Sequence, residues 1–222
     1  MNLLEQQKQY TFNFIAFLFI LLIILFDFYP SNLRPEPQFV GTVIVSGAAG
    51  RGSGVMTDIG IISSAHVLAS QMQFTVKHRS GLLYTGTEFI KYGQPETARD
   101  WVLLGFDSEE NGVGRGDIAK ISCQRPRIGD RVIVSGYPAA GQTPVFVQTT
   151  GRVISTELGH VHERFSGAFI VDNTTAPGTS GGPVYNQNGE VIGIVTSIIR
   201  GPEYSYYGTV ISPLPQSFCD MR

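Results

Sequence analysis

The sequence has little charge and little cysteine. Asp, Glu, Lys and Arg together make up 15% of the 222 residues, against about 25% in an average soluble protein, which argues against a disordered or coiled-coil chain. Two cysteines without CxxC spacing are too few for a disulfide scaffold or a cysteine metal site. The formal net charge is −2, so no basic field points to a nucleic-acid partner.

Helical periodicity is also scarce after residue 40, where no stretch keeps a 3.6-residue period for more than about two turns. By contrast, 26 glycines, 14 phenylalanines and 9 tyrosines favour short strands joined by tight turns. We therefore expect residues 39–222 to form one all-β domain, with strand spacing typical of a sandwich or barrel. The strand-like runs are residues 41–46, 54–57, 74–78, 82–90, 101–106, 131–135, 145–155, 168–171, 190–199 and 204–211.

The N-terminus has a different character. Residues 11–29 are almost entirely apolar, and as a helix at about 1.5 Å per residue they would span a bilayer. We expect a tail at 1–10, a transmembrane anchor at 11–29 and an extended linker at 30–38. A cleaved signal peptide and a buried core helix are the alternatives, although no small-x-small cleavage site follows. The short tail favours a cytoplasmic N-terminus, and hence a single-pass membrane protein with an extracytoplasmic domain.

Ser180 lies in the most informative segment, Ala-Pro-Gly-Thr-Ser-Gly-Gly-Pro at 176–183. A serine hydroxyl becomes a nucleophile when a base takes its proton and donors stabilise the resulting oxyanion. Glycines beside it let backbone N–H groups converge on one spot; the alternative is an ordinary glycine-rich turn. The segment also fits the G-x-S-x-G elbow of α/β-hydrolases, but that fold needs a histidine after the serine. All four histidines precede Ser180, which excludes it.

His66 is the preferred base because it follows a strand-like apolar run, although a structural histidine is the alternative. His78 stands between two basic residues and indicates an exposed strand edge. His160 and His162 fit a charged hairpin tip better than a metal pair, because no third ligand is evident. We expect no metal and no cofactor.

A buried carboxylate must orient the histidine. Asp100 is preferred because it directly precedes the apolar run 101–104. Asp172 is the second choice because it ends a strand shortly before Ser180. Asp107 and Asp130 fit turns, and Asp117 belongs to an Arg-Gly-Asp tripeptide of the kind that occurs by chance.

The order His66, Asp100, Ser180 resembles that of trypsin-like (chymotrypsin-fold) serine proteases. Five segments are similar to the Deg/HtrA-type protease domain in particular, and the likeness extends from about residue 41 to residue 213. These are GSGV at 52–55 with SAHV at 64–67, DWVLL at 100–104, IGDRV at 128–132 with GYP at 136–138, PGTSGGP at 177–183 and NGEVIGI at 188–194.

The resemblance implies two six-stranded antiparallel β-barrels with the active site between them. His66 would act as general base and then acid, Asp100 as its orienting partner, and Ser180 as the nucleophile that forms an acyl-enzyme. The N–H groups of Gly178 and Ser180 would form the oxyanion hole.

Substrate contacts are implied for Thr174, Thr175, Thr196, Ser197 and Ile198. None of these is charged, so cleavage after Arg or Lys is not expected, and a small or apolar side chain is favoured.

Two departures from relatives carry expectations. Thr179 stands where digestive trypsin-like enzymes have an aspartate that pairs with a new N-terminal amine, so we expect no activation by N-terminal cleavage. Nine residues follow Pro213, so no PDZ domain is expected. Asn173 begins a glycosylation sequon that we expect to be unused, because a glycan there would block the cleft. Cys123 and Cys219 either form one disulfide or remain free thiols.

The predicted function is a membrane-tethered serine endopeptidase that acts on proteins or peptides. A catalytically inactive trypsin-like binding module is the alternative, and a small-molecule esterase would share the acyl chemistry. The sequence carries no signal for an oligomeric state.

Overall fold

Short antiparallel strands make up nearly all of the regular structure. The computed structural model describes residues 40–47, 50–68, 73–139, 143–158, 163–200 and 206–221, and contacts group Phe39–Arg222 into one compact unit. The predicted tail, anchor and linker at 1–10, 11–29 and 30–38 lie outside the described residues. Among the helices that are described, none has the length and apolar character to cross a bilayer.

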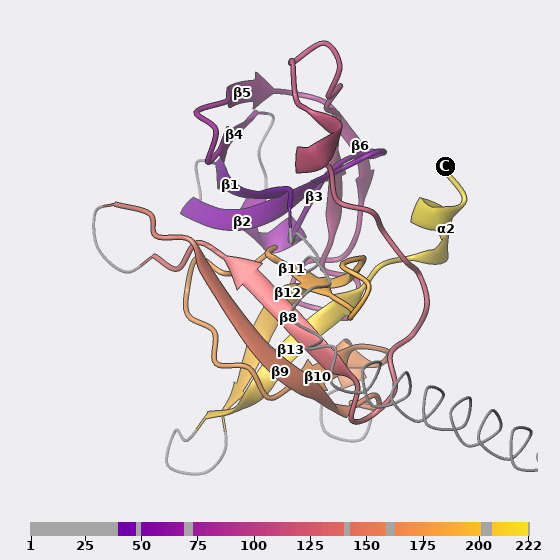
Figure 1. The fold of residues 1–222 in the computed structure, drawn as a ribbon. Coiled ribbons are helices and arrows are strands. Elements are labelled where there is room, and N and C mark those ends of the chain that lie inside the picture. Colours follow the sequence, from indigo (N-terminus) through magenta and orange to yellow (C-terminus); the bar gives the residue numbers. More distant parts are fainter. Residues whose placement is uncertain are drawn as a thin grey trace, which may run out of the picture. The chain divides into compact units, whose positions relative to one another are not determined.

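The first half of this unit is a seven-stranded sheet with the order β5-β4-β1-β2-β3-β7-β6, drawn in indigo to magenta in Figure 1. Every neighbouring pair is antiparallel. The strands are β1 (Thr42–Gly47), β2 (Gly50–Thr57), β3 (Gly60–Ser63), β4 (Phe74–His78), β5 (Leu83–Gly86), β6 (Phe89–Tyr92) and β7 (Val102–Leu104).

The second half is a closed antiparallel barrel with the order β10-β13-β12-β11-β8-β9. Its strands are β8 (Arg131–Gly136), β9 (Val147–Ser155), β10 (Phe169–Val171), β11 (Pro183–Tyr185), β12 (Val191–Arg200) and β13 (Tyr206–Pro213). Three short 3₁₀ helices, η2 (Ala65–Leu68), η3 (Arg115–Asp117) and η4 (Glu163–Phe165), interrupt the connections.

The all-β class is confirmed, but the expectation of two six-stranded barrels is wrong for the first half. The predicted strand at 82–90 is in fact two strands, because β5 pairs with β4 whereas β6 pairs with β7. Only Thr87 and Glu88 separate them, so the chain turns a corner there. The two strands form opposite edges of the sheet, and the ladders of the described strands do not join these edges. The strand-like run that precedes His66 is β3, whereas the short strand β11 had no separate signal in the sequence.

The two halves share a core of their own. Apolar side chains from both sheets meet there, among them Val55 and Leu103 from the first and Tyr185 and Ile194 from the second. The connecting segment crosses this junction, where Ala119 bridges to Thr57 of β2 and Ile121 bridges to Val191 of β12. Burying this apolar surface favours one fixed docking of the halves, and that docking brings their loops together.

A disulfide ties the C-terminus to the connection between the halves. Cys123 and Cys219 are bonded at 2.05 Å, so the bridged state is present rather than two free thiols. Cys219 ends the short helix α2 (Gln216–Cys219), whose Phe218 is fully buried. The Phe218 ring packs edge-on against Trp101, with the ring centroids 5.0 Å apart. The bridge therefore secures the segment that packs beside the start of β7.

Candidate active site

His66 and Asp100 lie together at one end of the first sheet. β3 and β7 are paired, with Ser63 opposite Val102, so the residues just after β3 and just before β7 are neighbours. His66 Nδ1 is 2.5 Å from Asp100 Oδ2, and the His66 backbone N–H donates to Asp100 Oδ1 at 3.0 Å. The carboxylate is fully buried, whereas 27% of the His66 side chain is exposed. A carboxylate at Nδ1 holds the tautomer whose Nε2 can accept a proton.

Thr196 completes the surroundings of this carboxylate. Its hydroxyl on β12 donates a short hydrogen bond to Asp100 Oδ2, so the second half of the molecule also holds the aspartate. From the sequence, Thr196 was expected only to contact the substrate, and its hydrogen bond to Asp100 was not predicted. One signal could have found it: Thr196 is the polar residue in a buried run of β12, and a buried hydroxyl requires a hydrogen-bond partner.

Ser180 lies in a tight turn between β10 and β11. Gly178 and Gly181 on either side of it have φ of +92° and +80°, which non-glycine residues rarely adopt. A Cβ on Gly178 would lie 2.6 Å from the Ala139 nitrogen, and one on Gly181 would lie 2.2 Å from the Ser53 carbonyl oxygen. Both glycines are therefore required by the backbone conformation and by the close approach of neighbouring chain.

Two N–H groups of this turn, those of Gly178 and Ser180, are the expected oxyanion donors. The Ala139 N–H donates to the Pro177 carbonyl at 2.7 Å. Because C=O and N–H point in opposite directions across a trans peptide, the Gly178 N–H points away from Ala139. Within the described part of the chain, neither the Gly178 nor the Ser180 N–H donates to a backbone carbonyl. Ser180 lines the cavity described next, whereas Gly178 is buried and is not among the residues that line it.

His66 and Ser180 line the same open cavity of about 360 Å³. Four of the five predicted substrate-contact residues line it as well, namely Thr175, Thr196, Ser197 and Ile198. Thr174 does not, and instead lines a neighbouring cavity of about 110 Å³. Among the described contacts, no hydrogen bond joins His66 to Ser180. Their predicted partnership rests on the shared cavity.

Six residues that line this cavity were not predicted as site residues. Ala176 and Pro177 belong to the Ser180 segment and Val195 to the predicted strand at 190–199, whereas Glu96, Arg164 and Phe165 lie outside every predicted strand and motif. Arg164 and Phe165 belong to η4, and the Arg164 guanidinium lies 4.9 Å from the Phe165 ring centroid. Glu96 is the non-glycine residue with a positive φ, 54°, in the described chain. No motif marks these positions, because they reach the cavity only when two connections from different halves meet.

The other candidate carboxylates are engaged elsewhere. Asp172 accepts a hydrogen bond from the Arg152 N–H at 2.6 Å, Asp130 accepts one from the Arg127 N–H, and Asp107 accepts two from its own turn. Asp117 of η3 has a carboxylate oxygen 3.9 Å from His78 Nε2. None of the four lines the cavity that His66 and Ser180 share.

The other histidines and the sequon also have local explanations. The expectation that His78 is exposed is wrong: it is 2% exposed, because its strand packs inward at that position. Its Nδ1 lies 2.8 Å from the Ser80 hydroxyl. His160 and His162 lie outside the described residues, and the described His, Cys, Asp and Glu side chains form no group that could hold a metal. Asn173 is buried and donates to Thr149, which is consistent with an unused sequon.

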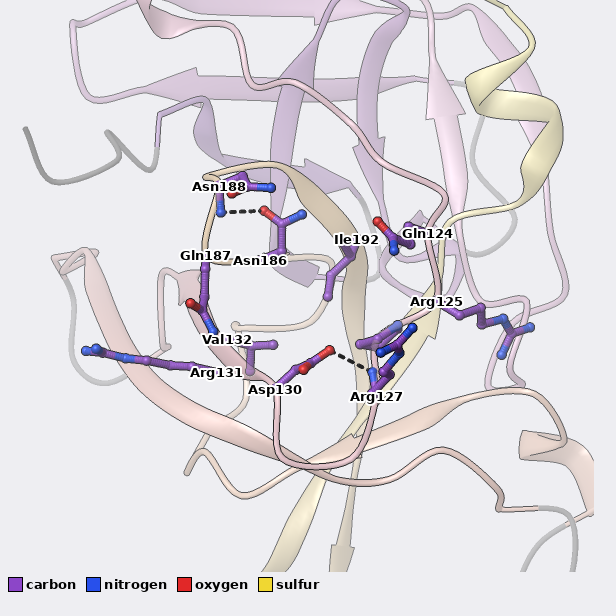
Figure 2. A pocket seen from close by; sticks show the side chains of 11 residues that line it. Gln124, Arg125, Arg127, Asp130, Arg131, Val132, Asn186, Gln187, Asn188 and Ile192 are labelled. Carbon is purple, nitrogen blue, oxygen red and sulfur yellow. Dashed lines mark hydrogen bonds between the residues drawn. The ribbon is translucent and has the colours of Figure 1, made fainter. Parts of the chain in front are cut away.

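A separate cavity of about 190 Å³ lies on the closed barrel, between the segment before β8 and the turn at 186–188. Asp130 and the Arg127 backbone are hydrogen-bonded at its rim, whereas the Arg125 and Arg131 side chains extend to opposite sides (Figure 2). The guanidinium groups therefore do not converge on a single anion. None of the predicted site residues lines this cavity.

Comparison with known families decides the class of this fold. The family model described as "Trypsin-like peptidase domain" matches residues 52–194, which include His66, Asp100 and Ser180. The chain belongs to the trypsin-like peptidase family. The predicted recognition of a trypsin-like serine protease domain is confirmed, and relatives named as serine proteases support its Deg/HtrA type and the predicted class of serine-type endopeptidase.

Curated relatives of this trypsin-like peptidase carry protease names. It is 31% identical over 156 residues to "Protease Do-like 2, chloroplastic" from Arabidopsis thaliana, covering 68% of this chain and 24% of that protein. It is 30% identical over 166 residues to "Serine protease HTRA4" from Mus musculus, covering 68% and 30%. The chain thus spans less than a third of the length of these relatives.

Solved structures give the same fold. A serine endoprotease from Yersinia pestis is 25% identical, with a TM-score of 0.58 over 85% of this trypsin-like peptidase and 62% of that chain. A structure titled "HtrA-type protease AlgW with tripeptide" is 21% identical, with a TM-score of 0.63 over 85% and 60%. The second likeness concerns the fold alone. The all-β chymotrypsin-like architecture is therefore established for this chain.

Proposed function

We propose that this protein is a membrane-tethered serine endopeptidase whose catalytic residues are His66, Asp100 and Ser180. The observation that carries the proposal is the His66–Asp100 pair at 2.5 Å, in which a buried carboxylate holds Nδ1 while the other side of the ring shares a cavity with Ser180. A buried carboxylate, an imidazole and a serine in this order are the parts that acyl transfer requires.

In the proposed reaction, Ser180 Oγ bonds to the carbonyl carbon of the scissile peptide while His66 Nε2 takes the hydroxyl proton. The N–H groups of Gly178 and Ser180 bind the resulting oxyanion, and the buried Asp100 stabilises the imidazolium. The C–N bond then breaks, the amine leaves with the proton from His66, and an acyl-Ser180 ester remains. A water molecule attacks the carbonyl carbon of this ester and gives a proton to His66. The ester C–O bond then breaks, His66 returns the proton to Ser180 Oγ, and the acid is released with Ser180 and neutral His66 restored.

Substrate preference follows from the lining of the cavity. Thr175, Ser197 and Ile198 present hydroxyl and apolar groups, so we propose that a small or apolar side chain precedes the scissile bond. The predicted substrate-contact residues offer a basic side chain no carboxylate, and the acidic residue on the cavity lining is Glu96, which is not one of them. Protein or peptide substrates are proposed on the same basis.

Thr179 supports a site that needs no activating cleavage. Its hydroxyl donates to the Ala176 carbonyl at 2.7 Å and accepts from the Ala176 N–H at 3.3 Å. The turn before Ser180 is therefore closed by its own side chain, without an ion pair to a new N-terminal amine. Membrane attachment and an extracytoplasmic position are proposed from the apolar character of residues 11–29 alone.

A rhodamine-linked fluorophosphonate tests the chemistry on the full chain in detergent. Ser180 Oγ bonds to phosphorus, the P–F bond breaks, fluoride leaves and His66 takes the serine proton. We expect labelling of the wild type and of the control Ser108→Ala, and none of Ser180→Ala. A wild type that does not label contradicts the proposal and favours the inactive binding module. Cleavage of ester substrates without any cleavage of casein would favour the esterase.

A further inference from the structure

Ser53 joins the first sheet to the turn that carries Ser180. It lies in β2, is fully buried and pairs with Ile44 of β1. Its backbone N–H donates to the Ser180 carbonyl at 2.7 Å, and its hydroxyl donates to the Gly178 carbonyl at 2.8 Å. One residue of the first sheet therefore holds two carbonyl groups of the second half.

The two carbonyls that Ser53 holds belong to the two residues with the free N–H groups. A hydrogen bond to the carbonyl of a residue restricts the rotation of that residue's following peptide, and so helps to fix its backbone conformation. For Gly178 this matters most, because glycine has the widest choice of conformations. Ser53 thus limits the alternatives open to both proposed oxyanion donors from a rigid neighbouring strand.

The Ser53 hydroxyl also contacts the segment after β8, which packs against the turn. Its oxygen accepts a hydrogen bond from the Tyr137 N–H at 2.8 Å, just after β8. Two residues further on, Ala139 donates to the Pro177 carbonyl, which sets the direction of the Gly178 N–H. The same oxygen therefore connects the Tyr137–Ala139 segment, the turn before Ser180 and β2. A small side chain that donates and accepts at once is needed here, and serine supplies both.

The position itself is held firmly. The Ser53 carbonyl accepts a hydrogen bond from the Ser63 hydroxyl on the neighbouring β3 at 2.7 Å. A Cβ on Gly136 would lie 3.0 Å from Ser53 Oγ, so the hydroxyl fills its space. Replacing it with a methyl group leaves the Tyr137 N–H and the Gly178 carbonyl without this partner in a buried place, and such groups destabilise the arrangement that holds them.

We propose that Ser53 is a positioning residue of the oxyanion hole, so that the donors stay aligned only while the first sheet is docked on the second half. This inference rests on the proposed function, because it assigns a cause to the alignment of Gly178 and Ser180. It makes the β2 strand part of the catalytic arrangement although Ser53 touches no substrate.

Inactivation by the same fluorophosphonate on the full chain tests this role, because the phosphoryl oxygen occupies the oxyanion position. In Ser53→Ala we expect the maximal inactivation rate to fall on the order of 10- to 100-fold, which is at or below the effect of losing one oxyanion donor. The probe concentration for half-maximal rate should change by less than about threefold, because the hydroxyl does not contact the probe. The acid limb of the pH profile should not move, because the His66–Asp100 pair is untouched.

Thr57→Val is the matched control. Thr57 lies on the same strand, is 2% exposed and donates a buried hydrogen bond to the Gly60 carbonyl at 2.7 Å, but it does not contact the turn at Ser180. Its inactivation rate should stay within about twofold of the wild type, even if its thermal unfolding midpoint falls as much as that of Ser53→Ala.

If Ser53→Ala does not fold, Ser53→Cys replaces it. A thiol fills the place of the hydroxyl but is a weaker donor and acceptor, so both hydrogen bonds are weakened. An unchanged maximal rate in the folded variant, or a loss confined to the half-maximal probe concentration, overturns the role of Ser53. An unreactive wild type instead overturns the proposed function, so the two failures are distinct.

Discussion

At the scale of single residues, the central feature is an imidazole with two different environments. Asp100 fixes one nitrogen of His66 from a fully buried position, and the rest of the ring faces the cavity. The carboxylate is itself held by the His66 N–H and by Thr196. These hydrogen bonds give its buried oxygens polar partners in a place where an unpaired polar group would be costly. The proposed base therefore has its tautomer set before any substrate binds.

Asp100→Asn tests this arrangement. Asparagine keeps the size of the side chain but permits the wrong tautomer of His66, so we expect kcat on a fluorescent casein to fall by about 10³- to 10⁴-fold. The urea unfolding curve checks that the fold is retained. Asp172→Asn, which alters a carboxylate bound to the Arg152 backbone, is the control and should keep its activity. Equal losses in the two variants would contradict the assignment.

His78 predicts a pH dependence of stability. Burial lowers the pKa of His78, and this effect is larger than the opposing influence of Asp117, which raises it, while Arg79 lowers it further. The folded state therefore binds fewer protons than the unfolded state, whose histidine has a pKa of about 6.5. The contribution of neutral His78 to the free energy of unfolding is fully present above the pKa of the unfolded histidine. It is lost as the pH falls from there through the lower pKa of His78 in the folded protein.

We therefore expect the free energy of unfolding to decrease on going from about pH 7.5 to about pH 5.5, and to decrease less in His78→Gln, which does not titrate. Urea unfolding of both proteins at each pH measures the difference. Because the other histidines are common to both proteins, the comparison isolates His78. Identical pH dependence would show that His78 does not contribute.

At the scale of elements, the turn at 176–182 carries Ser180, the proposed nucleophile. Two glycines with positive φ and the hydrogen bond from the Thr179 N–H to the Ala176 carbonyl determine the backbone conformation of this turn. All of these residues lie within the turn itself. Its orientation in the molecule comes from elsewhere, through Ser53 and Ala139. The turn therefore determines its own backbone conformation, whereas contacts with Ser53 and Ala139 determine how it is oriented in the molecule.

Gly178→Ala separates these contributions. The new Cβ would lie 2.6 Å from the Ala139 nitrogen, so the turn must shift and misdirect a donor, and we expect kcat to fall by about 10²- to 10³-fold. Gly129→Ala is a closely matched control, because Gly129 has the same φ of +92° but no atom within 4 Å of its Cβ. It should lose stability through backbone strain alone and retain its activity. Comparable activity losses in both variants would argue against the directed donor.

At the scale of the whole molecule, the site exists because two sheets dock. His66 and Asp100 come from the first sheet, whereas Ser180 and Thr196 come from the barrel. The shared core that includes Val55, Leu103 and Ile194 holds them in register. The disulfide acts at the same scale, because it ties the segment before β8 to α2, and Phe218 of α2 packs on Trp101 beside Asp100.

Removing the bridge should therefore destabilise the whole unit. Cys123 and Cys219 are 96 positions apart, and closing a loop of that size is worth up to roughly 4–5 kcal/mol on the entropic model. We expect the free energy of unfolding of the Cys123→Ser, Cys219→Ser double variant to fall by an amount of this order. Dithiothreitol should lower the stability of the wild type to the level of the variant and leave the variant unchanged. Sensitivity of the double variant to the reductant would point to another cause.

Much of this protein was determined by its sequence alone. Low charge, many glycines and short β-type runs specified the all-β class, and the strand Phe74–His78 was predicted with the boundaries that the structure shows. The order of His66, Asp100 and Ser180 and the glycines beside the serine were also readable, because nucleophilic catalysis restricts which residue types can stand together. Features that depend on neighbouring residues can therefore be predicted from the sequence.

The remaining features depend on contacts between distant parts of the folded chain. Two of these features are the corner at Thr87 and Glu88, which separates β5 from β6, and the burial of His78. Two others are hydrogen bonds between residues distant in sequence, from Thr196 to Asp100 and from Ser53 to Gly178. Alternation along a strand says which side chains share a face, but not which sheet that face will meet. That partner is chosen when apolar surfaces of both halves are buried together, and this choice depends on the whole chain.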